Sequence, residues 1–199
     1  MTSEPIGFRV MAGPAPHGFA TEHFLIRPVV EADAALDHAA VMSSKEFLRI
    51  WEQATWPEDD FTVESNREDL VKMQTRHHEG YAFGYTVMNL DETECLGCVY
   101  VMPPDAKMFA GAETDEAAEW DACDGTVYFW VRTALLDDVD RALLSELRRW
   151  FETEWSLSNV TFNTNEALLQ QVALYERSGL TLRYALTIPG EPARHLGYA

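Results

Sequence analysis

The sequence predicts an α+β fold with a mixed, mainly antiparallel central sheet flanked by helices. Three consecutive strand-like segments in the middle of the chain have no helix between them, which favours antiparallel pairing. Toward the C-terminus, strands alternate with helices, which is typical of parallel crossovers. The expected order is β-α-α-β-β-β-α-β-α-β, with strand 24–30, helices 31–44 and 63–78, strands 81–89, 95–102 and 125–133, helix 138–155, strand 160–163, helix 165–177 and strand 181–187.

Glycine and proline recur through residues 1–23, which predicts an irregular N-terminal leader with room for a short strand over 8–10. The remainder, 24–199, is the length of one ordinary domain and can bury a sizeable core. The chain shows no internal repeat and no low-complexity tract. We therefore expect a single domain behind a short leader.

The first helix is indicated by Ala35, Ala39 and Met42, which lie at helical spacing after the first apolar strand. A tryptophan-rich connection follows it. The second helix has a start signal in Thr62 and a stop signal in Gly80.

The three central strands are bounded by clear turn signals. Residues 81–89 alternate in side-chain type, and the acidic run 91–94 makes the turn into 95–102. Two prolines at 103–104 end that strand, because proline cannot donate to a strand ladder. The apolar run 125–133 predicts a buried strand.

The segment 105–124 contains seven acidic residues and one lysine, which predicts a long solvated loop or partial helix. The helix after it is strongly amphipathic, with Leu143, Leu147 and Phe151 on one face. Gly179 closes the last helix before the final strand.

Composition limits the kinds of partner that the chain can bind. It is 47% hydrophobic and 12% aromatic, with 15 basic and 33 acidic residues and a formal charge of −18. Such a chain is repelled by nucleic acid and by anionic membranes. The negative charge either serves solubility alone or also attracts a cationic amine as partner or substrate. No apolar run is long enough to span a membrane, and no secretory signal precedes the domain, so we expect a cytoplasmic protein.

The three cysteines are too few for a disulfide framework. Cys95 and Cys98 form a C-x-x-C motif inside an expected strand, where positions three apart face opposite sides of the sheet. Two ligands on opposite faces cannot share a metal without a bulge. The sequence therefore predicts that Cys95, Cys98 and Cys123 are small buried side chains and that they form no metal site.

Two segments carry a resemblance to a known superfamily. Phe24-Leu-Ile-Arg-Pro28 resembles the opening strand of the GNAT acyltransferases, particularly the branch related to ribosomal-protein N-terminal acetyltransferases. The stretch from Asn165 to Gly179, which ends in Leu-Tyr-Glu-Arg-Ser-Gly-Leu, resembles their closing motif. The resemblance covers about residues 24–187.

This resemblance implies transfer of an acetyl group from acetyl-CoA to an amine, which is either a small molecule or a protein N-terminus. It implies that Tyr175 protonates the departing thiolate, since a phenol with a pKa near 10 can do so. Asn165 would hold the pantetheine arm, and the backbone around Val131 would bind its amides. The alternatives are that Tyr175 is a core residue and that Asn165 is an ordinary helix cap.

One loop departs from the superfamily pattern, which is basic and glycine-rich. Asp138 and Asp140 fall where glycines are expected, and Asp137 or Asp138 is placed to cap the helix with its own carboxylate. One carboxylate about 4 Å from a phosphate costs on the order of 4 kcal/mol, which weakens acetyl-CoA binding. The positive charges of Arg132 and Arg141 are expected to offset this repulsion. The alternative is that Arg141 pairs with the neighbouring Asp137 or Asp138.

The acceptor side is less defined by sequence. Trp51, Trp56 and Phe61 are candidates for an aromatic acceptor pocket, although they equally suit packing between helices. The general base stays open, with Asp124 and Glu46 as acidic candidates.

Three functions are consistent with these features. The first is an N-acetyltransferase for an amine. The second is a binding or regulatory module with the same fold that has lost the coenzyme's pyrophosphate site. The third is a structural partner that forms a homodimer through edge strands and exposed aromatic side chains.

Overall fold

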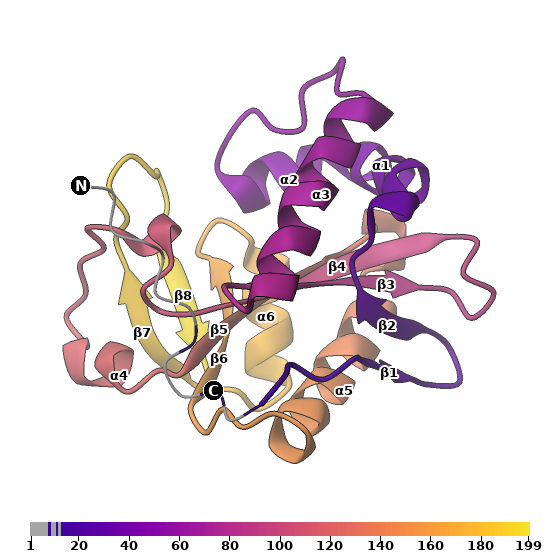
Figure 1. Ribbon diagram of the computed structural model, residues 1–199. Helices are drawn as coiled ribbons and strands as arrows, with labels where there is room; N and C mark the ends of the chain where they lie inside the picture. Colours follow the sequence, from indigo (N-terminus) through magenta and orange to yellow (C-terminus); the bar gives the residue numbers. More distant parts are fainter. Residues whose placement is uncertain (1–7, 9–10, 12) are drawn as a thin grey trace.

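The computed structural model describes residues 8, 11 and 13–199, and a single sheet runs through them (Figure 1). Its strands are β1 Phe19–Ala20, β2 Leu25–Pro28, β3 Phe83–Met88, β4 Cys95–Met102, β5 Gly125–Val131, β6 Val160–Asn165, β7 Leu182–Leu186 and β8 His195–Tyr198. Their order across the sheet is β1-β2-β3-β4-β5-β6-β8-β7. Neighbouring strands are antiparallel except β5 and β6, which are parallel. This is the mixed, mainly antiparallel sheet that the sequence predicts.

Helices cover both faces of this sheet (Figure 1). They are α1 Ala34–Ser43, α2 Lys45–Glu52, α3 Val63–Glu79, α4 Ala117–Asp121, α5 Val139–Thr153 and α6 Leu169–Arg177. Helices α1, α2 and α3 gather over β3 and β4, and α5 and α6 lie on the opposite face. None of the described helices is long and apolar enough to cross a membrane.

The main core lies between the sheet and α5. Leu143, Leu147 and Trp150 are buried there against alternate residues of β3, β4 and β5. The expected boundaries of α3 are confirmed, since Thr62 accepts from the Ser65 amide at its start. Gly80 ends the helix in a left-handed conformation, with φ of 76°.

Three elements differ from the sequence expectation, whereas short α4 agrees with the partial helix expected within the acidic segment. Helix α2 occupies the first part of the expected tryptophan-rich connection. Strand β1 lies in the leader, which was expected to be irregular, and β8 follows the last expected strand. Only one residue separates α2 from α1, and no turn signal in the sequence marks the boundary between them. Strand β8 has only four residues, which is too short for its alternation to be recognised in the sequence. Residues 9 and 10 of the possible leader strand lie outside the described part.

Strand β4 begins with a bulge that changes the side-chain alternation. Met88 of β3 pairs with Cys95, but the next pair is at Gly97, so Leu96 has no partner in β3. Leu96 packs in the α5 core, whereas Cys95 and Cys98 both lie on the α1 side. The expectation that the two cysteines face opposite sides is therefore wrong, because it assumed a regular strand.

Candidate active site

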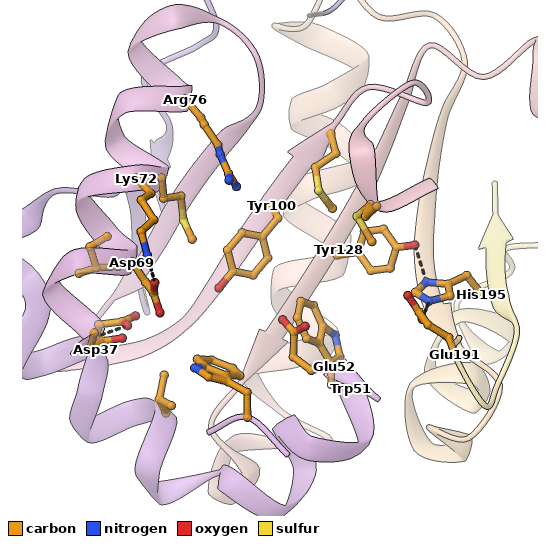
Figure 2. Close-up of a pocket in the computed structure, with 17 residues that line it drawn as sticks. Asp37, Trp51, Glu52, Asp69, Lys72, Arg76, Tyr100, Tyr128, Glu191 and His195 are labelled. Carbon is orange, nitrogen blue, oxygen red and sulfur yellow. Dashed lines mark hydrogen bonds and ion pairs between the residues drawn. The ribbon is translucent and has the colours of Figure 1, made fainter. Parts of the chain in front are cut away.

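A cavity of about 590 Å³ lies between the three N-terminal helices and the β4–β5 face (Figure 2). This volume suits a small molecule or a chain terminus. Trp51 and Trp56 line it, as the sequence anticipated, whereas Phe61 packs against Trp56 instead, with ring centroids 5.6 Å apart. The charged side chains on the cavity wall are Asp37, Glu52, Asp69, Lys72, Arg76, Glu191 and His195.

Three side chains at the β5 end of the cavity form a hydrogen-bonded series. The hydroxyl of Tyr128 lies 2.8 Å from Nδ1 of His195, and Nε2 of that ring lies 2.5 Å from a carboxylate oxygen of Glu191. An ionised Glu191 can only accept, which assigns the Nε2 proton to the ring and leaves Nδ1 to accept from the phenol. Burial raises the pKa of Tyr128 well above its ordinary value. This series connects the Tyr128 phenol to a pair formed by a buried imidazole and a half-buried carboxylate.

Gln53 holds this series in place from the end of α2. It takes a left-handed backbone conformation, with φ of 55°. Its side-chain amide donates to Glu191 over 2.8 Å and accepts from the Ala193 amide over 2.6 Å. The helix end and the loop before β8 are thereby locked together.

Glu52 points into the same cavity (Figure 2). Loss of solvent around the carboxyl raises its pKa, and the negative charge of Glu191 raises it further. A carboxyl group in a cavity with a raised pKa is a candidate for binding an ammonium group or exchanging its proton.

The opposite wall of the cavity carries two basic side chains from α3. Lys72 is paired with Asp69 over 2.9 Å. Arg76 forms no ion pair with any described residue, and Figure 2 shows it extending from α3 toward Tyr100. Asp37 and Asp69 also line this side of the cavity, so it carries charges of both signs.

A second feature lies beside the cavity, where β5 and β6 diverge. The two strands pair only over residues 125–127 and 160–162. Tyr175 of α6 is buried beside the resulting gap, with its ring centroid 6.0 Å from that of Phe129. Its hydroxyl donates to the carbonyl of Asn163 over 3.2 Å, and burial raises the pKa of the phenol well above its ordinary value.

The backbone of Val131 faces this gap. The backbone amide of Arg132 donates to the Leu96 carbonyl of β4. The backbone N–H and C=O groups of Val131, one residue earlier, therefore point the other way, toward β6. Gln171 partly fills the gap, because its side-chain nitrogen donates to the Phe129 carbonyl over 2.8 Å. The space left between Val131 and Gln171 is about 10 Å³.

Two residues expected near a coenzyme have other contacts. The Nε of Arg132 donates to the Cys95 carbonyl over 2.6 Å, at the start of β4. Asn165 ends β6 and does not start α6, so the helix-cap interpretation is wrong. Its side chain donates to the carbonyls of Ile50 and Trp51 over 2.8 and 3.1 Å, which fixes the end of α2.

The start of α5 is capped differently from expectation. Asp138 makes no capping hydrogen bond, and Asp137, at φ of 67°, lies 3.5 Å from Arg177. Asp140 is the carboxylate that turns inward, is 4% exposed, and accepts from the Arg141 amide over 2.7 Å. Burial raises the pKa of Asp140, while backbone hydrogen bonds oppose the rise. The left-handed turn at Asp137 directs its own side chain elsewhere.

Arg141 and the acidic candidates for a base also have clear positions. Arg141 forms no ion pair among the described residues, so the expected alternative of pairing with Asp137 or Asp138 is wrong. Glu46 pairs with Arg49 over 3.2 Å. Asp124 accepts from two backbone amides of the loop before β6. Neither acid lines the cavity, and the acids that do so come from segments without a sequence motif.

Comparisons with known proteins identify the fold. No protein-family model matches the chain, and a search of curated proteins finds no match either. Solved structures do match. The ribosomal-protein-S5-alanine acetyltransferase from Vibrio fischeri is 17% identical with a TM-score of 0.65, over 91% of this chain and 94% of that one.

Two further matches were solved with coenzyme A compounds. RimJ from Mycobacterium smegmatis, in complex with CoA-disulfide, has a TM-score of 0.65 at 14% identity and covers 88% of this chain and 80% of that chain. The microcin C7 self-immunity acetyltransferase MccE, in complex with acetyl-CoA and AMP, has a TM-score of 0.63 at 13% identity and covers 92% and 96%. The chain therefore has the fold of the GNAT acyltransferases, as its two motifs predicted.

Proposed function

We propose that this protein is an N-acetyltransferase that moves an acetyl group from acetyl-CoA to an amine bound in the 590 Å³ cavity. The observation that carries the proposal is the series Tyr128–His195–Glu191, which opens on the cavity beside the point where β5 and β6 diverge. The GNAT fold and the coenzyme complexes of the matching structures support the same chemistry.

On the acceptor side, the amine must lose a proton before it attacks. The Tyr128 oxygen accepts that proton while its own proton passes to Nδ1 of His195. Glu191 stabilises the imidazolium that results, because it accepts from Nε2. Glu52 supplies negative charge that attracts the ammonium form of the substrate.

On the donor side, acetyl-CoA supplies the activated thioester. The backbone groups of Val131 that face the gap fit an amide of the pantetheine arm. Tyr175 is placed beside the same gap and would protonate the thiolate that leaves. Asn165 acts as a positioning residue, because it fixes the end of α2 that carries Glu52.

At the start of α5, the Asp140 carboxylate accepts from the Arg141 amide, so that amide is not free for the pyrophosphate. Arg141, which is exposed and makes no ion pair with a described residue, is the cation that would meet the phosphates from the side. Arg132 is held at the start of β4 and takes no part in this arrangement.

The alternative of a non-catalytic binding module is not favoured. Two of the matching structures described above are named as acetyltransferases, and two hold coenzyme A compounds.

The test is acetyl transfer to a panel of small amines and peptides with free N-termini, followed by mass spectrometry. We expect an N-acetylated product, and we expect Tyr128→Phe and His195→Gln each to lower kcat by about 100-fold or more. His78→Gln is the matched control, since His78 is exposed and lies outside the cavity. Absence of any product, together with no rise in Tm on addition of acetyl-CoA, would overturn the proposal.

A further inference from the structure

A cluster of one carboxylate and two thiols lies beside the cavity and has no part in the chemistry above. Asp37 of α1 faces Cys95 and Cys98 of β4, and their ligand atoms all lie within 4.8 Å of one another. The Asp37 oxygen Oδ1 is 3.2 Å from Sγ of Cys98 and 3.7 Å from Sγ of Cys95. All three side chains are buried.

The backbone of β4 is shaped so that these thiols converge. In a regular strand, residues three apart point to opposite faces. The bulge at Leu96 reverses this for Cys95, which therefore shares the α1 face with Cys98. A bulge that brings two thiolate ligands together is the arrangement that a C-x-x-C strand needs to bind one ion.

A hydrogen bond from Asn66 also fixes the Asp37 carboxylate on the side away from the thiols. Asn66 of α3 is 2% exposed, and its side chain donates to Oδ2 of Asp37 over 2.9 Å and to the Ala34 carbonyl over 3.1 Å. This leaves Oδ1 directed at the thiols. Hydrogen bonds of this type orient the carboxylate ligands of metal ions.

We propose that Asp37, Cys95 and Cys98 bind Zn²⁺. Two thiolates and one carboxylate are a donor set that favours zinc over the harder cations, and zinc sites with three protein ligands keep a fourth position for water. The cavity reaches Asp37 (Figure 2) and also Asn66, so it provides the route for the ion and the water.

Thiolates are the form of cysteine that binds zinc, so binding of the ion releases the thiol protons. The affinity for zinc should therefore rise with pH.

The direct test adds Co²⁺ to the reduced full-length protein, since Co²⁺ reports thiolate ligation by a near-ultraviolet charge-transfer band. We expect one equivalent of Co²⁺, displaced by one equivalent of Zn²⁺. Zn²⁺ should raise Tm, and Mg²⁺ should not.

Substitutions assign the ligands. Cys95→Ser and Cys98→Ser should each remove the thiolate band and lower Zn²⁺ affinity at least 100-fold, whereas Asn66→Ala should lower it about 10-fold or more. Cys123→Ser is the matched control, because Cys123 is also buried but bonds to the Gly125 carbonyl, away from this cluster. It should bind zinc normally.

Three results would overturn the proposal. The first is no stoichiometric binding at micromolar Zn²⁺ to the unaltered protein. The second is binding that survives the double change Cys95→Ser with Cys98→Ser. The third is a Cys95–Cys98 disulfide in protein purified without reductant, detected by mass spectrometry. The measurements do not depend on acetyl transfer, so they stand apart from the proposed function.

Discussion

The hydroxyl of Tyr175 donates to a strand carbonyl in a gap from which solvent is excluded. We expect Tyr175→Phe to lower kcat for acetyl transfer by about 100-fold, because the thiolate then leaves without a proton donor. The free energy of unfolding should fall by only about 1 kcal/mol, since one neutral hydrogen bond is lost. Steady-state kinetics and urea denaturation measure the two quantities separately.

Tyr198→Phe is the control for this change, because the Tyr198 ring lies 5.5 Å from that of Tyr175 and is equally deep in the core. It should leave kcat within twofold. A Tyr175→Phe protein with unchanged kcat would assign Tyr175 to the core alone.

In the proposed function, Asp140 should affect binding of the coenzyme and not of the acceptor. We expect Asp140→Asn to bind acetyl-CoA about tenfold more tightly, because the side chain still caps the helix but no longer repels a phosphate. Calorimetric titration with CoA at low salt measures this. Asp138→Asn, at an exposed position without a cap contact, should change the affinity less. Equal effects of the two changes would contradict the inward placement of Asp140.

The sequence predicts some site residues better than others. Trp51 and Trp56, which line the cavity, are candidates from the sequence because a cluster of aromatic residues is visible there. His195 and Glu191 could not be found, because their role depends on β8 lying beside β6, a contact that no local pattern encodes. Asp140 was recognised as unusual, but its inward turn depends on the left-handed backbone at Asp137.

Among the elements, β4 depends most closely on a single glycine. A Cβ on Gly97 would lie 2.1 Å from the Trp130 carbonyl oxygen and 2.8 Å from the Cα of Val131. We expect Gly97→Ala to destabilise the protein by about 3 kcal/mol, since the β4–β5 backbones must move apart. Gly190→Ala, which meets open space but has φ of 91°, should cost about 1 kcal/mol. Urea denaturation compares them, and equal losses would contradict the close approach.

The predictability of the elements follows their length and their end signals. The limits of β4 and the start of α3 agree with the sequence because prolines and a threonine cap mark them. The mixed, mainly antiparallel sheet is predicted from the order of strands and helices along the chain. The bulge in β4 could not be predicted, because one extra residue leaves the apolar pattern unchanged while it alters the face that Cys95 occupies.

For the whole molecule, stability should depend on pH through groups whose pKa is raised. Loss of solvent is the first cause for Asp37, Glu52 and Asp140. Each contributes stability that is complete below its unfolded pKa, 3.8 for aspartate and 4.5 for glutamate, and is lost as pH rises through the higher folded value. The free energy of unfolding should therefore fall as pH rises above about 4.5.

Three further features affect this pH dependence. The charge of −18 acts in the same direction, because protonation reduces repulsion between acidic side chains. Asp59, whose pKa is lowered to about 2 by Lys45 and Arg49, opposes it only at more acidic pH. His77, whose pKa is lowered by burial, opposes it below pH 6.5, and its single contribution is smaller than that of the three acids together. Denaturation at several pH values, with a chelator present, measures the slope, and Asp37→Asn should flatten it. A stability that rises with pH between 5 and 8 would contradict the prediction.

The left-handed turn at Gln53 has a consequence for engineering the acceptor specificity of the proposed acetyltransferase. The Gln53 side-chain amide hydrogen-bonds to both Glu191 and the Ala193 backbone. The end of α2 and the loop before β8 are therefore expected to move together. Libraries that randomise either segment by itself should yield mostly inactive clones. Productive variants should appear when position 53 and positions 191–195 are varied together, and natural relatives should show paired changes at the same places.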